Sequence, residues 1–174
     1  MERVKGLTGV GSLKHDAQEK QMNICLNPVG HVRSTRAQLE DDHWDAVESH
    51  VELETRFNPS ALEGLVDFSH VEIVFFMDRV ETSKIETGAR HPRNNPNWEK
   101  VGIFAQRGKN RPNQIGTTIC QIKRVDGNKL YLTGLDALDG TPVLDIKPWV
   151  QEFGPRGPIR QPNWISDLMS NYWS

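Results

Sequence analysis

The chain has 174 residues, the length of one domain with at most a short tail, and 21 Lys and Arg against 23 Asp and Glu leave a net charge of only −2. A domain of this size buries about two-thirds of its unfolded surface, so it needs no disulfide or metal to hold its core together. Two cysteines are too few for a disulfide framework. The start of the chain does not resemble a signal peptide, and no apolar run is long enough to span a bilayer. We therefore expect a cytoplasmic protein.

The first half of the chain predicts strands after a polar start. Residues 1–21 show no sustained periodicity, which predicts a mobile arm before a domain at 22–150. Apolar residues on alternate positions predict a first strand at 24–32. Strict alternation predicts a half-buried strand at 51–57, and the nearly continuous apolar run at 71–77 predicts a central one.

The second half predicts further strands and one helix. A short strand is expected at 101–105, a hairpin at 115–135 with an Asp-Gly turn at 126–128, and a last strand at 142–150. In the C-terminal extension, 151–174, Asn163 is the expected N-cap of a helix. Its apolar stripe comprises Trp164, Ile165, Leu168, Met169 and Tyr172. Many short strands with one terminal helix favour a mainly β fold, a small closed or partly open barrel or a sandwich, over βαβ units.

The charges are unevenly distributed along the chain. Residues 38–54 contain seven acids and no Lys or Arg, whereas residues 90–124 contain eight Lys or Arg and one acid, Glu99. Such polarisation presents a basic face to phosphates even at a net charge near zero. The alternative is that the two segments simply pair with each other, and the sequence leaves both readings open.

Two other segments have residues suited to chemistry. The loop 104–116 combines Arg107, Lys109 and Arg111 with Gly and Pro, which suits binding of a carboxylate, a phosphate or a stacked base, or else a solvated hairpin tip. The segment 134–148 contains a turn at 139–142, and its Asp145 and Lys147 share one face of a strand as a binding pair or a surface ion pair. Glycine-rich nucleotide fingerprints and metal-ligand spacings are absent, so we expect no metal.

Six motifs in order resemble the TsaA-type family, also called TrmO or YaeB, from about Asn23 to Trp149. They are Glu-Gly-Leu at 63–65, Phe-Ser-His at 68–70, His-Pro-Arg at 91–93, the stretches 102–107 and 111–116, and the long segment 134–148. The resemblance implies a small β-barrel without a Rossmann fold that binds S-adenosylmethionine as a homodimer. It further implies methylation of the threonylcarbamoylated adenosine next to the anticodon of transfer RNA.

The resemblance also implies the residues of the cofactor pocket. Arg107 matches a strand-end arginine of the family, although Gln106 replaces its threonine, and Gln114 stands where the family usually has proline. Asp42-His43-Trp44 replaces the family's proline-arginine-glutamine. The full set of expected cofactor-binding residues is Asp42, His43, Trp44, Asp78, Arg79, Arg107, Thr117, Asp136, Leu138 and Asp139.

Methyl transfer from a sulfonium requires the donor and acceptor to be held in line, and a base that removes a proton from the acceptor nitrogen would help. Asp136, Asp145 and His91 are candidates for that base, and the sequence does not choose among them. The cations expected to contact RNA are Arg90, Arg93, Lys109, Arg111, Lys123 and Arg124. A non-catalytic sensor of S-adenosylmethionine and a methyltransferase with another substrate remain the alternatives.

Overall fold

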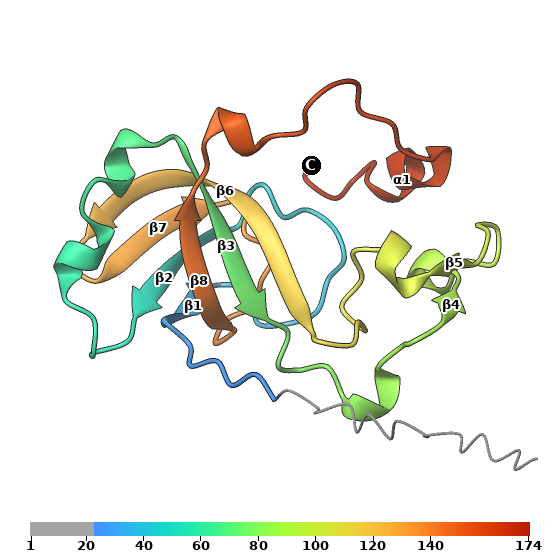
Figure 1. Ribbon diagram of the computed structural model, residues 1–174, viewed down its shortest axis with the longest axis horizontal. Helices are drawn as coiled ribbons and strands as arrows, with labels where there is room; N and C mark the ends of the chain where they lie inside the picture. The colour runs from blue at the N-terminus through green and yellow to red at the C-terminus, as the bar shows by residue number, and fades with distance from the viewer. Residues whose placement is uncertain (1–22) are drawn as a thin grey trace, which may run out of the picture.

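A computed structural model describes residues 23–174, and its main body is a closed antiparallel barrel (Figure 1). The strands are β1 (Gly30–Ser34), β2 (Glu48–Leu53), β3 (His70–Phe76), β6 (Ile115–Asp126), β7 (Lys129–Thr133) and β8 (Pro142–Pro148). They follow the order β1-β2-β7-β6-β3-β8 around the barrel, and β8 closes it by pairing with β1. The prediction of a mainly β, non-Rossmann barrel is confirmed, whereas the predicted arm at 1–21 lies outside the described residues.

The core lies inside the barrel and follows the alternation of its strands. In β3 every second residue is buried, and Val71, Ile73 and Phe75 point inward. They meet Val32, Val51, Cys120, Leu130, Leu132 and Val143 from the other strands. Gly116 of β6 lies against the Phe75 ring, and a Cβ at this position would approach the ring carbons to 2.4 Å. Any side chain at position 116 would therefore displace the ring of Phe75, its pairing partner on β3.

Several strand boundaries differ from the sequence prediction. The first strand starts at Gly30 rather than at residue 24, and Ile24 and Leu26 are 76% and 58% exposed. Apolar residues at alternate positions do not form a strand where no neighbouring strand pairs with them and buries their side chains. The second strand occupies 48–53 rather than 51–57, because the chain turns at 54–57, where the Phe57 N–H donates to the Glu54 carbonyl. The hairpin of β6 and β7 and its turn, with Gly127 at φ 57°, are confirmed.

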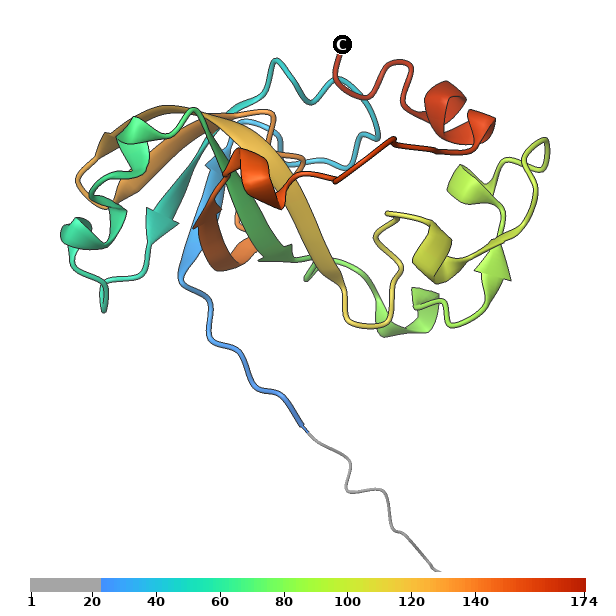
Figure 2. The ribbon, with the colours of Figure 1, turned by 45° about the horizontal axis from the view of Figure 1, so that its top comes forward.

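Residues 77–114 form a second lobe beside the barrel (Figures 1 and 2). The lobe contains a short ladder of β4 (Ala89–Arg90) and β5 (Val101–Gly102), so the strand expected at 101–105 has only two residues. The 3₁₀ turns η3 (Thr82–Lys84), η4 (Pro92–Asn94) and η5 (Ile103–Ala105) complete the lobe. Three further 3₁₀ turns lie elsewhere: η1 (Pro59–Leu62), η2 (Leu65–Asp67) and η6 (Gln151–Phe153).

The last segment contains the α-helix α1 (Asn163–Leu168), which lies next to the second lobe in both views. The Trp98 and Trp164 rings, 6.4 Å apart between centroids, join the lobe to α1. Asn163 was predicted as the N-cap, and this was wrong: it is the first helical residue, and Pro162 precedes it in the cap position. The helix is also shorter than its apolar stripe, so Tyr172 lies beyond it in a segment that returns to the barrel. Within residues 23–174 no helix has the length and apolarity needed to cross a membrane.

Candidate functional site

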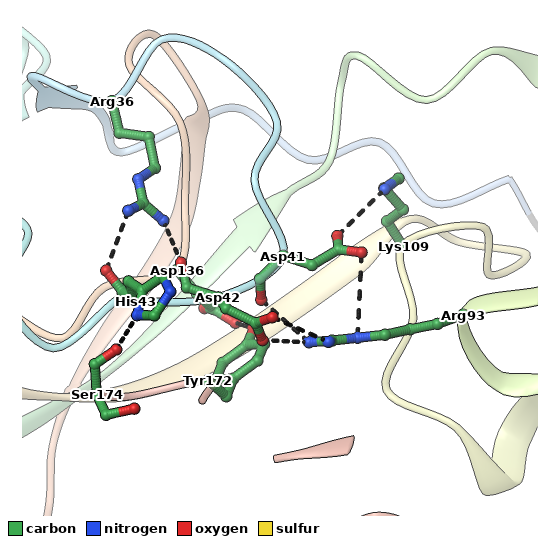
Figure 3. Close-up of polar contacts among 9 residues, drawn as sticks. All are labelled: Arg36, Asp41, Asp42, His43, Arg93, Lys109, Asp136, Tyr172 and Ser174. Atoms are coloured by element: carbon green, nitrogen blue, oxygen red, sulfur yellow. Dashed lines mark hydrogen bonds and ion pairs between the residues drawn. The ribbon is translucent and has the colours of Figure 1, made fainter. Parts of the chain in front are cut away.

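Asp136 is the centre of a polar cluster just after β7 (Figure 3). One oxygen of its carboxylate accepts a hydrogen bond from the Thr118 hydroxyl of β6, and the other accepts one from the Tyr172 hydroxyl. Thr118 is buried and points into the barrel end, whereas Tyr172 reaches Asp136 from the C-terminal segment. The carboxylate is therefore held by two hydroxyl groups from elements far apart in the sequence.

The loop that contains Asp42, His43 and Trp44 lies against the same cluster. Trp44 packs with Val47 and Leu138 in a small apolar cluster, and Tyr172 packs against it. The loop is held by Arg36, whose guanidinium donates to the carbonyl oxygens of Asp42 at 2.8 Å and His43 at 3.0 Å. The same guanidinium stacks 4.3 Å from the centre of the Trp44 ring. The structure thus brings together Asp42, His43, Trp44, Asp136 and Leu138, five of the expected cofactor-binding residues.

An ion pair joins this loop to the second lobe. The Arg93 guanidinium lies 2.7 Å from the Asp42 carboxylate, and both side chains are about a quarter exposed, 26% and 28%. The hydrogen bond from Arg93 lowers the pKa of Asp42 below its ordinary value, and the charge of Arg93 acts in the same direction. Asp42 is therefore anionic at neutral pH and neutralised by its partner.

Arg107 and Thr117 form the next part of the site. The Arg107 guanidinium donates to the Thr117 carbonyl at 2.6 Å and lies 3.2 Å from its hydroxyl. Burial and the neighbouring Asp136 raise the pKa of Tyr172, while the charges of Arg107 and Arg93 partly oppose this rise. The phenol of Tyr172 therefore stays protonated and lies near a carboxylate and two guanidinium groups.

The remaining expected pocket residues lie around Asp139 rather than around Asp136. Arg79 donates to the carbonyl oxygens of Ala37 at 2.7 Å and Asp139 at 2.5 Å. The Asp139 carboxylate accepts the backbone N–H of Ser34 at 3.0 Å, so it also fixes the end of β1. Asp78 is exposed next to Arg79. These contacts brace the segment 136–139 against the loop after β1.

The structure separates the three candidate bases. Asp136 lies in the cluster, whereas Asp145 lies on β8 and forms an ion pair with Lys147. The Nδ1 of His91 lies 2.6 Å from the Trp98 carbonyl in the second lobe. Of the three, only Asp136 contacts another residue of the cluster around Trp44 and Leu138.

The six expected RNA-binding cations lie in three places. Arg93 and Lys109 face the acidic loop, where Lys109 lies 3.9 Å from Asp41, so the acidic and basic segments pair in part. Arg90 and Arg111 contact the second lobe itself, through Asn94 and the Gln106 carbonyl. Lys123 and Arg124 lie on the outer face of β6, where Arg124 stacks on Tyr131 at 3.3 Å from the ring centre.

Two departures from the family pattern have structural roles. Gln106 is buried, and its amide donates to the carbonyls of Arg90 at 3.1 Å and Val101 at 2.9 Å, which ties the two short strands of the lobe together. Gln114 has φ 51° and its amide donates to the carbonyls of Met77 and Val80. A proline cannot adopt that φ, so this loop has a conformation that the family's usual residue would not allow.

Sequence reasoning missed Thr118, Arg36 and the site role of Tyr172. Thr118 follows the expected residue Thr117, but the alternation of β6 directs the two side chains to opposite faces. Tyr172 completed an apolar helical stripe and so was assigned to the helix.

The family model of the tRNA-methyltransferase O N-terminal domain matches residues 36–154. The chain belongs to this family. A tRNA (adenine(37)-N6)-methyltransferase of Mus musculus is 34% identical over 139 residues, which cover 75% of this chain and 32% of that protein. A "Probable S-adenosyl-L-methionine-binding protein" of Pyrococcus abyssi is 34% identical over 142 residues, covering 79% of this chain and 74% of that protein.

Solved structures agree with the fold. A crystal structure of TrmO from Pseudomonas aeruginosa superposes with a TM-score of 0.63 at 31% identity, over 80% of this chain and 62% of that chain. The chain therefore spans less than two-thirds of this relative, and about a third of the mouse protein. All the residues of the Asp136 cluster except Tyr172 lie inside the matched range 36–154.

Proposed function

We propose that this chain is an S-adenosylmethionine-dependent methyltransferase that modifies the N6 position of an adenosine in transfer RNA. The observation that supports this most directly is the cluster at Asp136: its carboxylate accepts hydrogen bonds from Thr118 and Tyr172, and Tyr172 packs against Trp44 and Leu138. The charge of Arg107 also acts on Tyr172. Relatives named as tRNA (adenine(37)-N6)-methyltransferases point to the same reaction.

The residues of the cluster fit the cofactor chemically. Trp44 and Leu138 form the buried apolar side of the cluster beneath Tyr172, and Asp136 offers carboxylate oxygens for hydroxyl or ammonium groups. Arg107 offers a planar fork for a carboxylate. Bound S-adenosylmethionine supplies an electrophilic methyl group on a positively charged sulfur.

The contribution of the chain to the reaction is then mainly one of positioning. A rigid pocket that orients donor and acceptor replaces a bimolecular encounter by an intramolecular one. Asp136 is the favoured candidate to accept a proton from the acceptor nitrogen, because among Asp136, Asp145 and His91 it alone lies in the cluster.

The proposed acceptor nucleoside, oligomeric state and cellular location rest on the family resemblance. We propose N6-threonylcarbamoyladenosine next to the anticodon as the acceptor, and a homodimer in the cytoplasm as the working form. The outer face of β6, with Lys123 and Arg124, and the loop with Lys109 are the surfaces proposed for RNA phosphates.

A non-catalytic S-adenosylmethionine sensor is the second candidate. One observation favours it: the Pyrococcus abyssi relative, of which this chain covers 74%, is named for binding S-adenosylmethionine and not for methyl transfer. A sensor would keep the donor pocket and lack affinity for RNA.

Titration calorimetry with S-adenosylmethionine tests the cofactor assignment. We expect one site per chain, and a large loss of affinity in Asp136→Asn, with Asp145→Asn as the matched control that leaves binding unchanged. Absence of heat at high micromolar donor, or equal losses in both variants, would remove the donor site from the Asp136 cluster.

A further inference from the structure

The C-terminal segment 171–174 lies along the loop 43–45 and closes one side of the Asp136 cluster. The backbone N–H groups of His43, Trp44 and Asp45 donate to the carbonyls of Asn171, Tyr172 and Trp173 at 3.0, 2.9 and 3.2 Å. The His43 ring also contacts the Ser174 carbonyl oxygen. This closing segment lies beyond the residues 36–154 that match the family.

We propose that Tyr172 is a positioning residue of the donor site, which acts by fixing the carboxylate of Asp136. The proposal rests on the proposed function, because it assigns Tyr172 to the same pocket. Its ring packs on the cluster of Trp44, Val47 and Leu138, and its hydroxyl donates to Asp136. The segment 171–174 thereby contributes a side chain to a site that the family match builds only in part.

The geometry explains why a hydroxyl at this place matters for binding. Thr118 and Tyr172 donate to different oxygens of Asp136, so the carboxylate cannot rotate without losing one of the two bonds. A carboxylate has about four lone-pair positions, so each oxygen can still accept another donor. Asp136 is thus pre-oriented as an acceptor for the ammonium or the ribose hydroxyls of the cofactor, and pre-orientation lowers the cost of binding.

The surroundings keep the phenol in its donating form. Burial raises the pKa of Tyr172, and so does Asp136, so the hydroxyl retains its proton at neutral pH. Arg93 and Arg107 lie near enough to oppose this rise. A protonated phenol can donate to Asp136, whereas a phenolate would repel it.

Tyr172→Phe tests the proposal because it keeps the ring and removes only the hydroxyl. We expect the dissociation constant for S-adenosylmethionine to rise about tenfold, as for loss of a hydrogen bond to a charged group. The KM for the donor should rise in parallel, and kcat at saturating donor should fall less than in Asp136→Asn, which removes the carboxylate itself. Tyr131→Phe is the matched control, since Tyr131 is the only other tyrosine of the chain and lies on the outer face of the barrel, and it should leave donor affinity unchanged.

A double-mutant cycle separates positioning through Asp136 from a general effect on structure. In the Asp136→Asn background, Tyr172→Phe should add little further loss of donor affinity, because its target is already gone. Three results would overturn the proposal. Tyr172→Phe could lower donor affinity equally in both backgrounds, it could leave donor affinity unchanged, or it could raise donor affinity because the segment 171–174 competes with the donor. If the unsubstituted chain binds no donor, the proposed function fails and the inference fails with it; donor binding that Tyr172→Phe leaves unchanged defeats the inference alone.

Discussion

Arg93 forms a bidentate contact with the Asp42 carboxylate: its Nη2 lies 2.7 Å from Oδ1 and its Nη1 lies 3.2 Å from Oδ2. Arg93 belongs to the second lobe and Asp42 to the loop of the barrel, so this pair joins the two parts beside the candidate site. A two-pronged contact of this kind fixes orientation as well as distance. Of the ion pairs between the lobe and this loop, the Arg93–Asp42 pair is the shortest, and longer contacts of Arg93 and Lys109 to Asp41 add to it.

We expect Asp42→Asn to destabilise the fold by about 0.5–1 kcal/mol near neutral pH, the range of partly exposed ion pairs. Because the folded-state pKa of Asp42 is lowered, its stabilising effect is present above its ordinary value of 3.8 and is lost as the pH falls through the lowered value. The two proteins should thus become equally stable in strong acid. Urea unfolding at a series of pH values measures this, and a constant difference down to acid pH would contradict the ion-pair explanation.

Gly116→Ala should destabilise the barrel by roughly 1–3 kcal/mol, because the new methyl group would overlap the Phe75 ring. Gly102→Ala is the matched control, since nothing lies within 4 Å of a Cβ placed there. Thermal unfolding of both variants is the measurement. Equal melting temperatures for the two would mean that the Phe75 ring moves aside at no cost.

Gln114→Pro should cost more than Gln114→Gly, although proline is the residue the family usually has here. Proline cannot reach φ 51°, and it would lose the N–H that donates to the Arg111 carbonyl at 3.0 Å. Glycine accepts the conformation and loses only the side-chain bonds to Met77 and Val80. Denaturant midpoints compare the two, and a proline variant as stable as the glycine variant would show that the loop adopts the family conformation without strain.

The barrel was largely predictable because its signals are local. The alternation of Val71, Ile73 and Phe75 indicates β3, and the Asp-Gly turn at 126–127 indicates the β6–β7 hairpin. Both patterns can be recognised within a short stretch of sequence. The first strand was misplaced because Ile24 and Leu26 alternate without a partner strand, and only pairing of Gly30 with Leu53 and Val143 decides where β1 begins.

The site was predictable only where the family resemblance named residues. Asp136, Trp44 and Leu138 were expected in it, and the structure gathers them. Tyr172 was not expected there, because its place depends on the chain turning back after Leu168, a long-range contact to the loop 43–45 that no local pattern encodes. The partial pairing of the acidic and basic segments likewise depends on how the second lobe packs against the loop that contains Asp41 and Asp42.

If RNA binds the outer face of β6 and the loop around Lys109, the affinity for transfer RNA should fall steeply with salt. Lys123→Ala and Lys109→Ala should each reduce the slope by roughly one counterion and leave the melting temperature nearly unchanged. Arg93→Ala should instead lower the melting temperature, because it leaves the Asp42 carboxylate without its partner. Filter binding across a salt series, with thermal unfolding alongside, distinguishes these outcomes; flat salt dependence with lowered melting points for the lysine variants would defeat the RNA assignment.

Transfer of a labelled methyl group tests the proposed function most directly. The full chain is incubated with methyl-labelled S-adenosylmethionine and bulk transfer RNA that contains threonylcarbamoyladenosine, and the RNA is digested to nucleosides for mass spectrometry. We predict label in N6-threonylcarbamoyladenosine, strongly reduced by Asp136→Asn and retained by Asp145→Asn. Donor binding in calorimetry without any labelled nucleoside would contradict the methyltransferase assignment and favour the sensor.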